Sequence, residues 1–193
     1  MSRAEGRRKL LGTLLALSIP TMVEEILATL LQYVDTAMVG RLGEQATAAV
    51  SITTTINWLV GSIGGAIGTA ILAMISRAVG SGDRELVRSL SKQALFLATG
   101  CGIVLGSTCI FLSPFIPVWM GAEETIQAEA SAYFFIISLP MIFRVYTTIL
   151  GASIRATQDT RTPMMISMTA NGLNMVLNYI LIYSLNLGVR GAA

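Results

Sequence analysis

The sequence predicts an all-α integral membrane protein, in which several helices cross the bilayer and pack into one polytopic bundle. Two features indicate this fold class. Hydrophobic residues make up 53% of the 193 residues and charged residues only 12%, whereas about a quarter of the residues in soluble domains are charged. The apolar residues also gather in long runs, each able to provide the roughly 20 helical residues that cross about 30 Å of hydrocarbon.

The apolar runs predict five membrane-spanning helices, separated by short connections rich in glycine and charge. The expected helices cover approximately 10–39, 46–79, 86–119, 126–154 and 163–185. Several are longer than one span, so they should tilt, kink or project from the bilayer. The connections leave no room for a soluble domain, so we expect residues 1–193 to form one transmembrane unit. The last residues, GVRGAA, resemble a loop and the start of a sixth helix, and we expect that span to be incomplete.

The first expected helix carries carboxylates inside its apolar run. Its basic start resembles a signal peptide, but the apolar run continues past Pro20 to Val39 without a cleavage site. Its polar side chains share one helix face roughly 100° wide; they are Thr21, Glu24, Glu25, Gln32 and Asp35. Because intramembrane carboxylates usually face a bundle interior or a watery cavity, this face predicts a substrate cavity or a proton relay. The alternative is that the two glutamates are packed, protonated residues.

The second expected helix contains the glycine-rich stretch GSIGGAIG. Its small residues form two overlapping faces, Gly61 with Gly65 and Gly64 with Gly68. Small residues at this spacing let neighbouring helix backbones approach closely, so we expect these faces to pack against other helices.

Prolines interrupt the first and fourth expected helices. Pro20 and Pro140 each remove a backbone donor, so each should bend its helix. Arg144 follows Pro140 by four residues and lies deep in its apolar segment, about 16 Å of helix from the end. We considered Glu24 or Glu25 as its partner.

The fifth expected helix repeats a polar face with neutral groups. Four side chains lie within roughly 60° of one another around the helix; they are Ser167, Asn171, Asn174 and Asn178. Two interpretations stay open. The groups could form hydrogen bonds between helices, or amide oxygens could help a carboxylate to hold a cation such as Na⁺.

Basic residues are unevenly distributed between the two ends of the expected bundle. One end holds Arg3, Arg7, Arg8, Lys9, Arg77, Arg84, Arg88, Arg155 and Arg161. The opposite connections hold Arg41, Glu123, Glu124, Glu129 and Arg190. Because basic residues concentrate on the cytoplasmic side, we expect a multi-pass protein of the cell membrane with its N-terminus in the cytoplasm.

Composition and motifs also exclude several function classes. The chain has no histidine and no phosphate-binding loop, so neither a histidine-based catalytic triad nor an ATP site is expected. A net charge of +2 provides no extended basic surface for nucleic acid. We therefore expect no enzyme activity, no organic cofactor and no nucleic-acid partner.

Three motifs in order along the chain resemble the multidrug and toxic compound extrusion (MATE) transporters. IPTMVEEILATLLQYVDTAMVGRLG has a proline fifteen residues before an aspartate in a V-D-T-x-M-V-G context, as in the family's first helix. GASIRATQDTRTPM resembles the family's loop between the fourth and fifth helices. NMVLNYILIY resembles its N-x-x-x-(N/D) fifth helix. The resemblance covers essentially the whole chain.

This resemblance implies twelve helices in two pseudosymmetric lobes, of which the chain would hold five helices of the first. It implies export of organic, often cationic, compounds in exchange for Na⁺ or H⁺. The implied cation site comprises Asp35, Asn174 and Asn178, with Tyr133 nearby, and Pro20 matches the position where the first helix bends. Two positions depart from the pattern. Gln158 replaces a glycine of the loop motif, and Asn178 replaces an aspartate, which leaves the choice between Na⁺ and H⁺ open.

The expected function is therefore secondary active multidrug efflux, with small-molecule drugs, the bilayer and a missing C-terminal lobe as partners. Two alternatives were considered: a flippase for lipid-linked precursors in the same superfamily, and a non-transporting membrane assembly subunit. The narrow polar faces argue against a scaffold, because a scaffold need not keep ionisable groups at membrane depth.

Overall fold

A computed structural model describes residues 3–184 and residue 191 of the chain, and these residues form helices joined by short turns, with no strand. The helices are α1 (Arg3–Gly40), α2 (Glu44–Gly80), α3 (Arg84–Leu112), α4 (Ile116–Trp119), α5 (Glu124–Ser138), α6 (Met141–Ala156) and α7 (Arg161–Tyr179), followed by a π-helix, η1 (Ile180–Ser184). By length and composition, four helices of the described chain could cross a membrane, and α5 with α6 could form a fifth, bent span. The predicted fold class is confirmed.

Two of the expected segments are divided differently in the structure. The segment 86–119 ends as an α-helix at Leu112, and the four-residue α4 follows after a turn. Pro114 accounts for this break, because a proline inside a helix removes a backbone donor. Pro117 lies in the first turn of α4, where a proline is tolerated. In the segment 163–185 the α-helix ends at Tyr179 and the wider η1 continues it; residue 185 lies outside the described residues.

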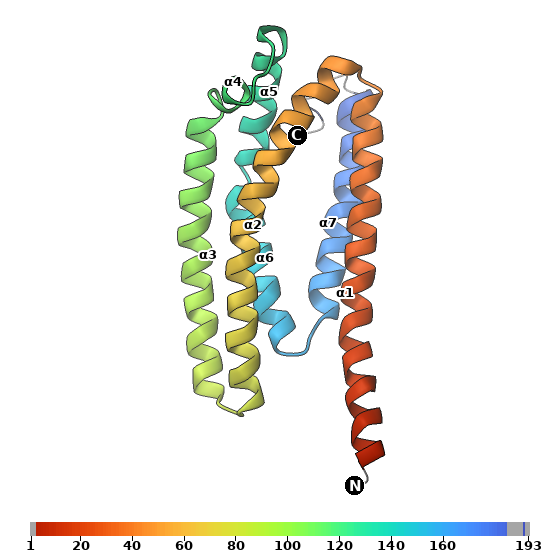
Figure 1. The fold of residues 1–193 in the computed structure, drawn as a ribbon, viewed down its shortest axis with the longest axis vertical. Helices are drawn as coiled ribbons and strands as arrows, with labels where there is room; N and C mark the ends of the chain where they lie inside the picture. Colours follow the sequence, from red (N-terminus) through yellow and green to blue (C-terminus); the bar gives the residue numbers. More distant parts are fainter. Residues whose placement is uncertain (1–2, 185–190, 192–193) are drawn as a thin grey trace.

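The helices pack as two groups (Figure 1). One group contains α2, α3, α5 and α6, and the other consists of α1 lying beside α7. The larger group holds the main core, where Ile75, Phe134 and Ile149 are completely buried. Contacts between the two groups are sparser than those within the larger one. The α1–α7 pair is therefore joined to the rest of the bundle along a narrower interface.

Close contact between α6 and its neighbours depends on glycines. A Cβ atom at Gly102 of α3 would lie 2.8 Å from Ile142 Cγ1, and one at Gly68 of α2 would lie 3.4 Å from the Thr148 carbonyl oxygen. The close packing predicted for Gly64 and Gly68 is thus confirmed. For the other face, Gly61 and Gly65, a Cβ atom would meet nothing within 4 Å in the part of the chain that the structure describes, so the prediction is wrong there.

The two intramembrane prolines behave differently. At Pro140 the fourth expected helix breaks, and α5 and α6 meet at 47°, which confirms the predicted interruption. Helix α1 instead continues through Pro20 as one helix, and a bend at Pro20 stays a prediction.

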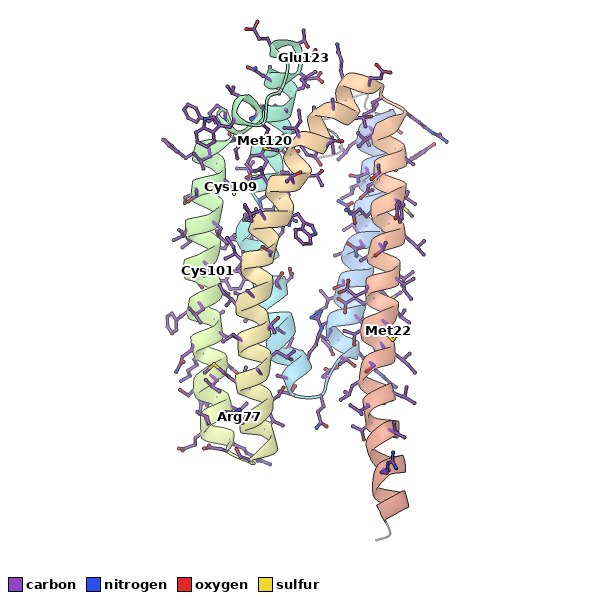
Figure 2. The ribbon with its side chains drawn as sticks, viewed as in Figure 1. Met22, Arg77, Cys101, Cys109, Met120 and Glu123 are labelled. Carbon is purple, nitrogen blue, oxygen red and sulfur yellow. The ribbon has the colours of Figure 1, made fainter. Side chains whose placement is uncertain are left out.

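The outer surface of the bundle is apolar along its length. Large hydrophobic side chains project outward from the helices, as Met22 does in Figure 2. Met22, Phe96 and Phe111 are each more than half exposed. Such a continuous apolar surface suits contact with lipid rather than water. Arg77 lies at the end of the bundle that the N-terminus shares, and Met120 and Glu123 lie at the opposite end.

Candidate functional site

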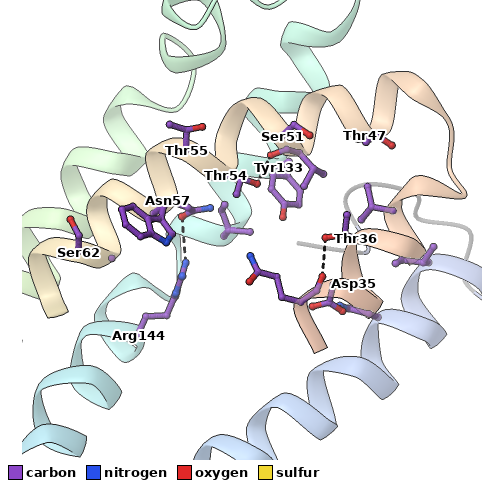
Figure 3. A pocket seen from close by; sticks show the side chains of 18 residues that line it. Asp35, Thr36, Thr47, Ser51, Thr54, Thr55, Asn57, Ser62, Tyr133 and Arg144 are labelled. Atoms are coloured by element: carbon purple, nitrogen blue, oxygen red, sulfur yellow. Dashed lines mark hydrogen bonds between the residues drawn. The ribbon is translucent and has the colours of Figure 1, made fainter. Parts of the chain in front are cut away.

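A cavity of about 1080 Å³ lies between the α1–α7 pair and the larger helix group (Figure 3). Side chains from α1, α2, α5, α6, α7 and η1 line it. Its charged and polar lining residues are Gln32, Asp35, Thr36, Thr47, Ser51, Thr54, Thr55, Asn57, Ser62, Tyr133, Arg144 and Asn178. The volume is large enough for a drug-sized molecule.

Asp35 and Asn178 line the cavity and form a small polar cluster with Asn174, which is exposed and does not line it. Nδ2 of the buried Asn178 donates to Asp35 Oδ1 at 3.1 Å and to Asn174 Oδ1 at 3.2 Å. The two asparagines lie four residues apart on α7, so they project from the same helix face. Among the described residues, no lysine or arginine forms an ion pair with Asp35. The cluster therefore brings together three residues of the expected cation site around a carboxylate that lacks a fixed cation.

The other expected site residues are divided between the cavity and the outside. Tyr133 of α5 and Gln32 of α1 line the same cavity as Asp35. Glu25 is exposed and Asn171 half-buried, and neither lines the cavity. The structure thus brings Tyr133 and Gln32 to Asp35 but leaves Glu25 and Asn171 apart from it.

A second carboxylate cluster lies nearer the N-terminal end of α1. Glu24 accepts hydrogen bonds from Ser167 Oγ at 2.6 Å and from Arg155 Nη2 at 3.2 and 3.4 Å. The Glu24 side chain is only 10% exposed, and that of Arg155 is 26% exposed. This cluster joins α1, α6 and α7 and contains its own counter-charge.

The pairing considered for Arg144 is therefore wrong. Glu24 pairs with Arg155 from the last turn of α6, whereas Arg144 reaches across to Asn57 of α2, with Nη1 3.4 Å from Oδ1. The reason lies in helix packing. Glu24 lies beside the C-terminal end of α6, whereas Arg144 lies about 16 Å earlier along that helix.

Sequence reasoning missed one wall of the cavity. Helix α2 contributes a run of polar residues in SITTTINW, 51–58, of which five line the cavity: Ser51, Thr54, Thr55, Asn57 and Trp58. The signal was present, since such a concentration of hydroxyl and amide groups is unusual in a helix that spans hydrocarbon.

The connection between α6 and α7 is ordered by Asp159. Its Oδ1 accepts from the backbone N–H groups of Arg161 at 3.1 Å and Thr162 at 3.0 Å, and its Oδ2 accepts from Thr162 Oγ1 at 2.6 Å. Hydrogen bonds from Thr162, foremost among the causes, lower the pKa of Asp159. Gln158 has a φ of 69°, a left-handed conformation that glycine adopts without strain. This explains why glycine is usual at that position of the loop motif.

The fold and cavity define a class, namely a multi-pass membrane protein whose helices line a large cavity with polar side chains. The MatE family model matches residues 20–180, and the chain belongs to the MATE family. It is 32% identical over 185 residues to a probable multidrug resistance protein NorM of Thermotoga maritima, covering 93% of this chain and 40% of that relative. It is also 28% identical to an FAD transporter of Shewanella oneidensis, covering 93% of this chain and 41% of that protein.

Solved structures show the same likeness. An outward-facing multidrug resistance MATE transporter of the MOP superfamily matches with a TM-score of 0.89 and 26% identity, over 93% of this chain and 40% of that one. A MOP superfamily transporter from Pyrococcus furiosus matches with a TM-score of 0.86 and 26% identity, over the same shares. The chain thus spans about 40% of the length of these relatives. Members of this family are transporters, not enzymes.

Proposed function

We propose that the chain forms the lobe of a secondary active multidrug transporter that exports organic compounds in exchange for Na⁺ or H⁺. The observation that carries this proposal is Asp35, a carboxylate in the wall of a large cavity without a fixed cation. No observation favours the flippase or the assembly subunit.

The environment of Asp35 supports a mobile counter-ion. A carboxylate at membrane depth is costly unless a cation or a proton neutralises it. Asn174 and Asn178 supply amides, whose oxygens are hard ligands suited to a small cation, and Asn178 also stabilises the ionised carboxylate by donating to it. The cluster can therefore alternate between an ionised state and a neutralised state as a coupling ion binds and leaves.

The packing of the helices in two groups allows neutralisation of Asp35 to move the α1–α7 pair. Asp35 lies on α1, and its partners lie on α7, so both sides of the cluster belong to the more loosely attached helix pair. Binding of an ion at Asp35 alters the hydrogen bond from Asn178 and shifts the balance between arrangements of the pair. Because the pair forms one side of the cavity, this shift changes access for a bound drug.

The orientation expected from charge fits the arrangement of the helices. The N-terminus lies at the same end of the bundle as the α2–α3 and α6–α7 connections, and Arg84 and Arg161 begin the helices that follow those connections. We assign this end to the cytoplasm, so that Asp35 lies toward the outer half of α1. The proposed partners are small organic molecules and the bilayer. Transport would need the coupling ion and no organic cofactor.

The test is drug resistance in cells that express the protein from its complete gene. Asp35→Asn keeps the size of the side chain but removes its charge, so resistance should fall to the level of cells with an empty vector. Glu44→Gln serves as a matched control, because Glu44 is an exposed acid in the first turn of α2 and does not line the cavity. Wild-type resistance in Asp35→Asn cells, at equal protein levels, would refute the proposal.

A further inference from the structure

Arg144 places a permanent positive charge in the cavity wall. Its side chain lies opposite Asp35 in the cavity and points toward Asn57 (Figure 3). A guanidinium carries five N–H donors. Among the described residues, this guanidinium donates to the side chain of Asn57 at a long 3.4 Å, and no carboxylate lies within ion-pair distance.

A cation in this position needs a counter-charge. Arginine stays protonated at any physiological pH, and an unpaired charge at membrane depth is costly. The contrast with Arg155 is direct, because Arg155 on the same helix pairs with Glu24. Within the described part of the chain, the remaining donors of Arg144 therefore face the cavity, where water or a ligand can supply acceptors.

The surroundings of Arg144 favour an aromatic ligand. Trp58 follows Asn57 on α2, lines the same cavity and is 78% exposed. An indole ring offers an apolar face against which another ring stacks. Thr54 and Ser62 add hydroxyl groups to the same helix wall.

We propose that Arg144 and Asn57 bind the carboxylate of a transported aromatic compound, whose ring lies against Trp58. Guanidinium matches carboxylate geometry by two parallel hydrogen bonds. One fixed cation balances one negative charge, which favours a carboxylate over a doubly charged phosphate. With Asp35 on the opposite side, the cavity presents one acid and one base. The inference rests on the proposed export function and narrows its substrates to aromatic carboxylates, zwitterions included.

The test compares rhodamine B, which carries a free carboxylate, with its ethyl ester, which lacks it. Binding of each dye to the purified full-length protein is measured by fluorescence polarisation. Arg144→Gln should weaken binding of rhodamine B by about tenfold or more, as expected for loss of a charge-assisted hydrogen bond, and should change binding of the ester less than about twofold. Arg144→Lys should recover part of the loss for rhodamine B, because it keeps the charge but not the paired geometry.

Two controls separate the outcomes. Lys92→Gln removes an exposed charge of α3 and should leave both dyes unaffected. Trp58→Leu should weaken both dyes. An equal loss for acid and ester in Arg144→Gln, or no loss for either, overturns the carboxylate subsite while the export function stands. Should Arg144→Gln fail to fold, the ratio of the two affinities in Arg144→Lys decides the question in the same way. Failure of the wild type to bind rhodamine B also overturns the subsite, whereas the export function is judged separately by the drug-resistance test of Asp35→Asn.

Discussion

Two carboxylates on α1 face α7, and they have different partners. Glu24 lies beside Ser167 and accepts from Arg155 at 3.2 Å, whereas Asp35 accepts from an amide of Asn178 at 3.1 Å. They are separated by about 16 Å along the helix. Glu24 has a fixed cation and Asp35 has none among the described residues, so we propose that the first joins helices and that the second is available to a mobile ion. A polar face on a membrane helix therefore need not have one role along its length.

The largest expected effect is the loss of ion-driven drug transport in Asp35→Asn. In proteoliposomes that hold the full-length protein, Asp35→Asn should abolish drug movement driven by an ion gradient while its melting temperature stays near that of the wild type. The charge that Asp35 loses has no ion-pair partner among the described residues, so folding should lose little. A large drop in melting temperature would instead make Asp35 a structural residue.

The next effect concerns protein stability at the cluster of Glu24, Arg155 and Ser167. Glu24→Gln leaves Arg155 without its counter-charge in a mostly buried position, and breaking a buried pair is strongly destabilising. Because a quarter of the Arg155 side chain is exposed, we expect a loss of about 2 kcal/mol, measured by thermal unfolding in detergent.

A double-mutant cycle tests the same pair. Arg155→Gln alone should be destabilising, and the Glu24→Gln, Arg155→Gln double variant should be more stable than the sum of the single losses predicts. Additive losses would show that the two side chains do not stabilise one another.

A third carboxylate, Asp159, lies in a connection outside the membrane-spanning helices and allows the pH dependence of stability to be tested. Its folded pKa is lowered, so the unfolded chain binds the proton more tightly and stability rises with pH. The contribution is present above the unfolded pKa of about 3.9 and is lost as pH falls through the lower folded pKa. Asp159→Asn should therefore flatten the decline in melting temperature below about pH 4; an unchanged decline would assign the pH dependence to other groups.

The smallest effect is expected at Glu25. This residue is exposed and does not line the cavity, so Glu25→Gln should change neither the melting temperature nor the transport rate beyond experimental error. A transport defect in this variant, with normal folding, would restore Glu25 to the proton relay expected from its place on the polar face.

The sequence predicted the partners of Asp35 better than those of Glu24, for a physical reason. Asp35 and Asn178 are each marked by position on a helix face and by motif, and both properties depend on local spacing. The partner of Glu24 depends instead on how α6 lies against α1, which spacing within one helix does not determine. The break after Leu112 could have been predicted from Pro114. The polar residues of SITTTINW indicate the α2 wall of the cavity, but the glycines that follow them on the same helix indicate close packing instead.

Gradient-driven exchange in proteoliposomes tests the central claim most directly, namely that Asp35 and not Glu24 carries the exchangeable cation. Export of a bound drug is recorded under an imposed pH gradient and, separately, under an imposed Na⁺ gradient, normalised to folded protein. We predict that the wild type and Glu24→Gln respond to at least one gradient, and that Asp35→Asn binds drug but responds to neither. A wild-type response in Asp35→Asn, or a response lost in Glu24→Gln alone, would contradict the account.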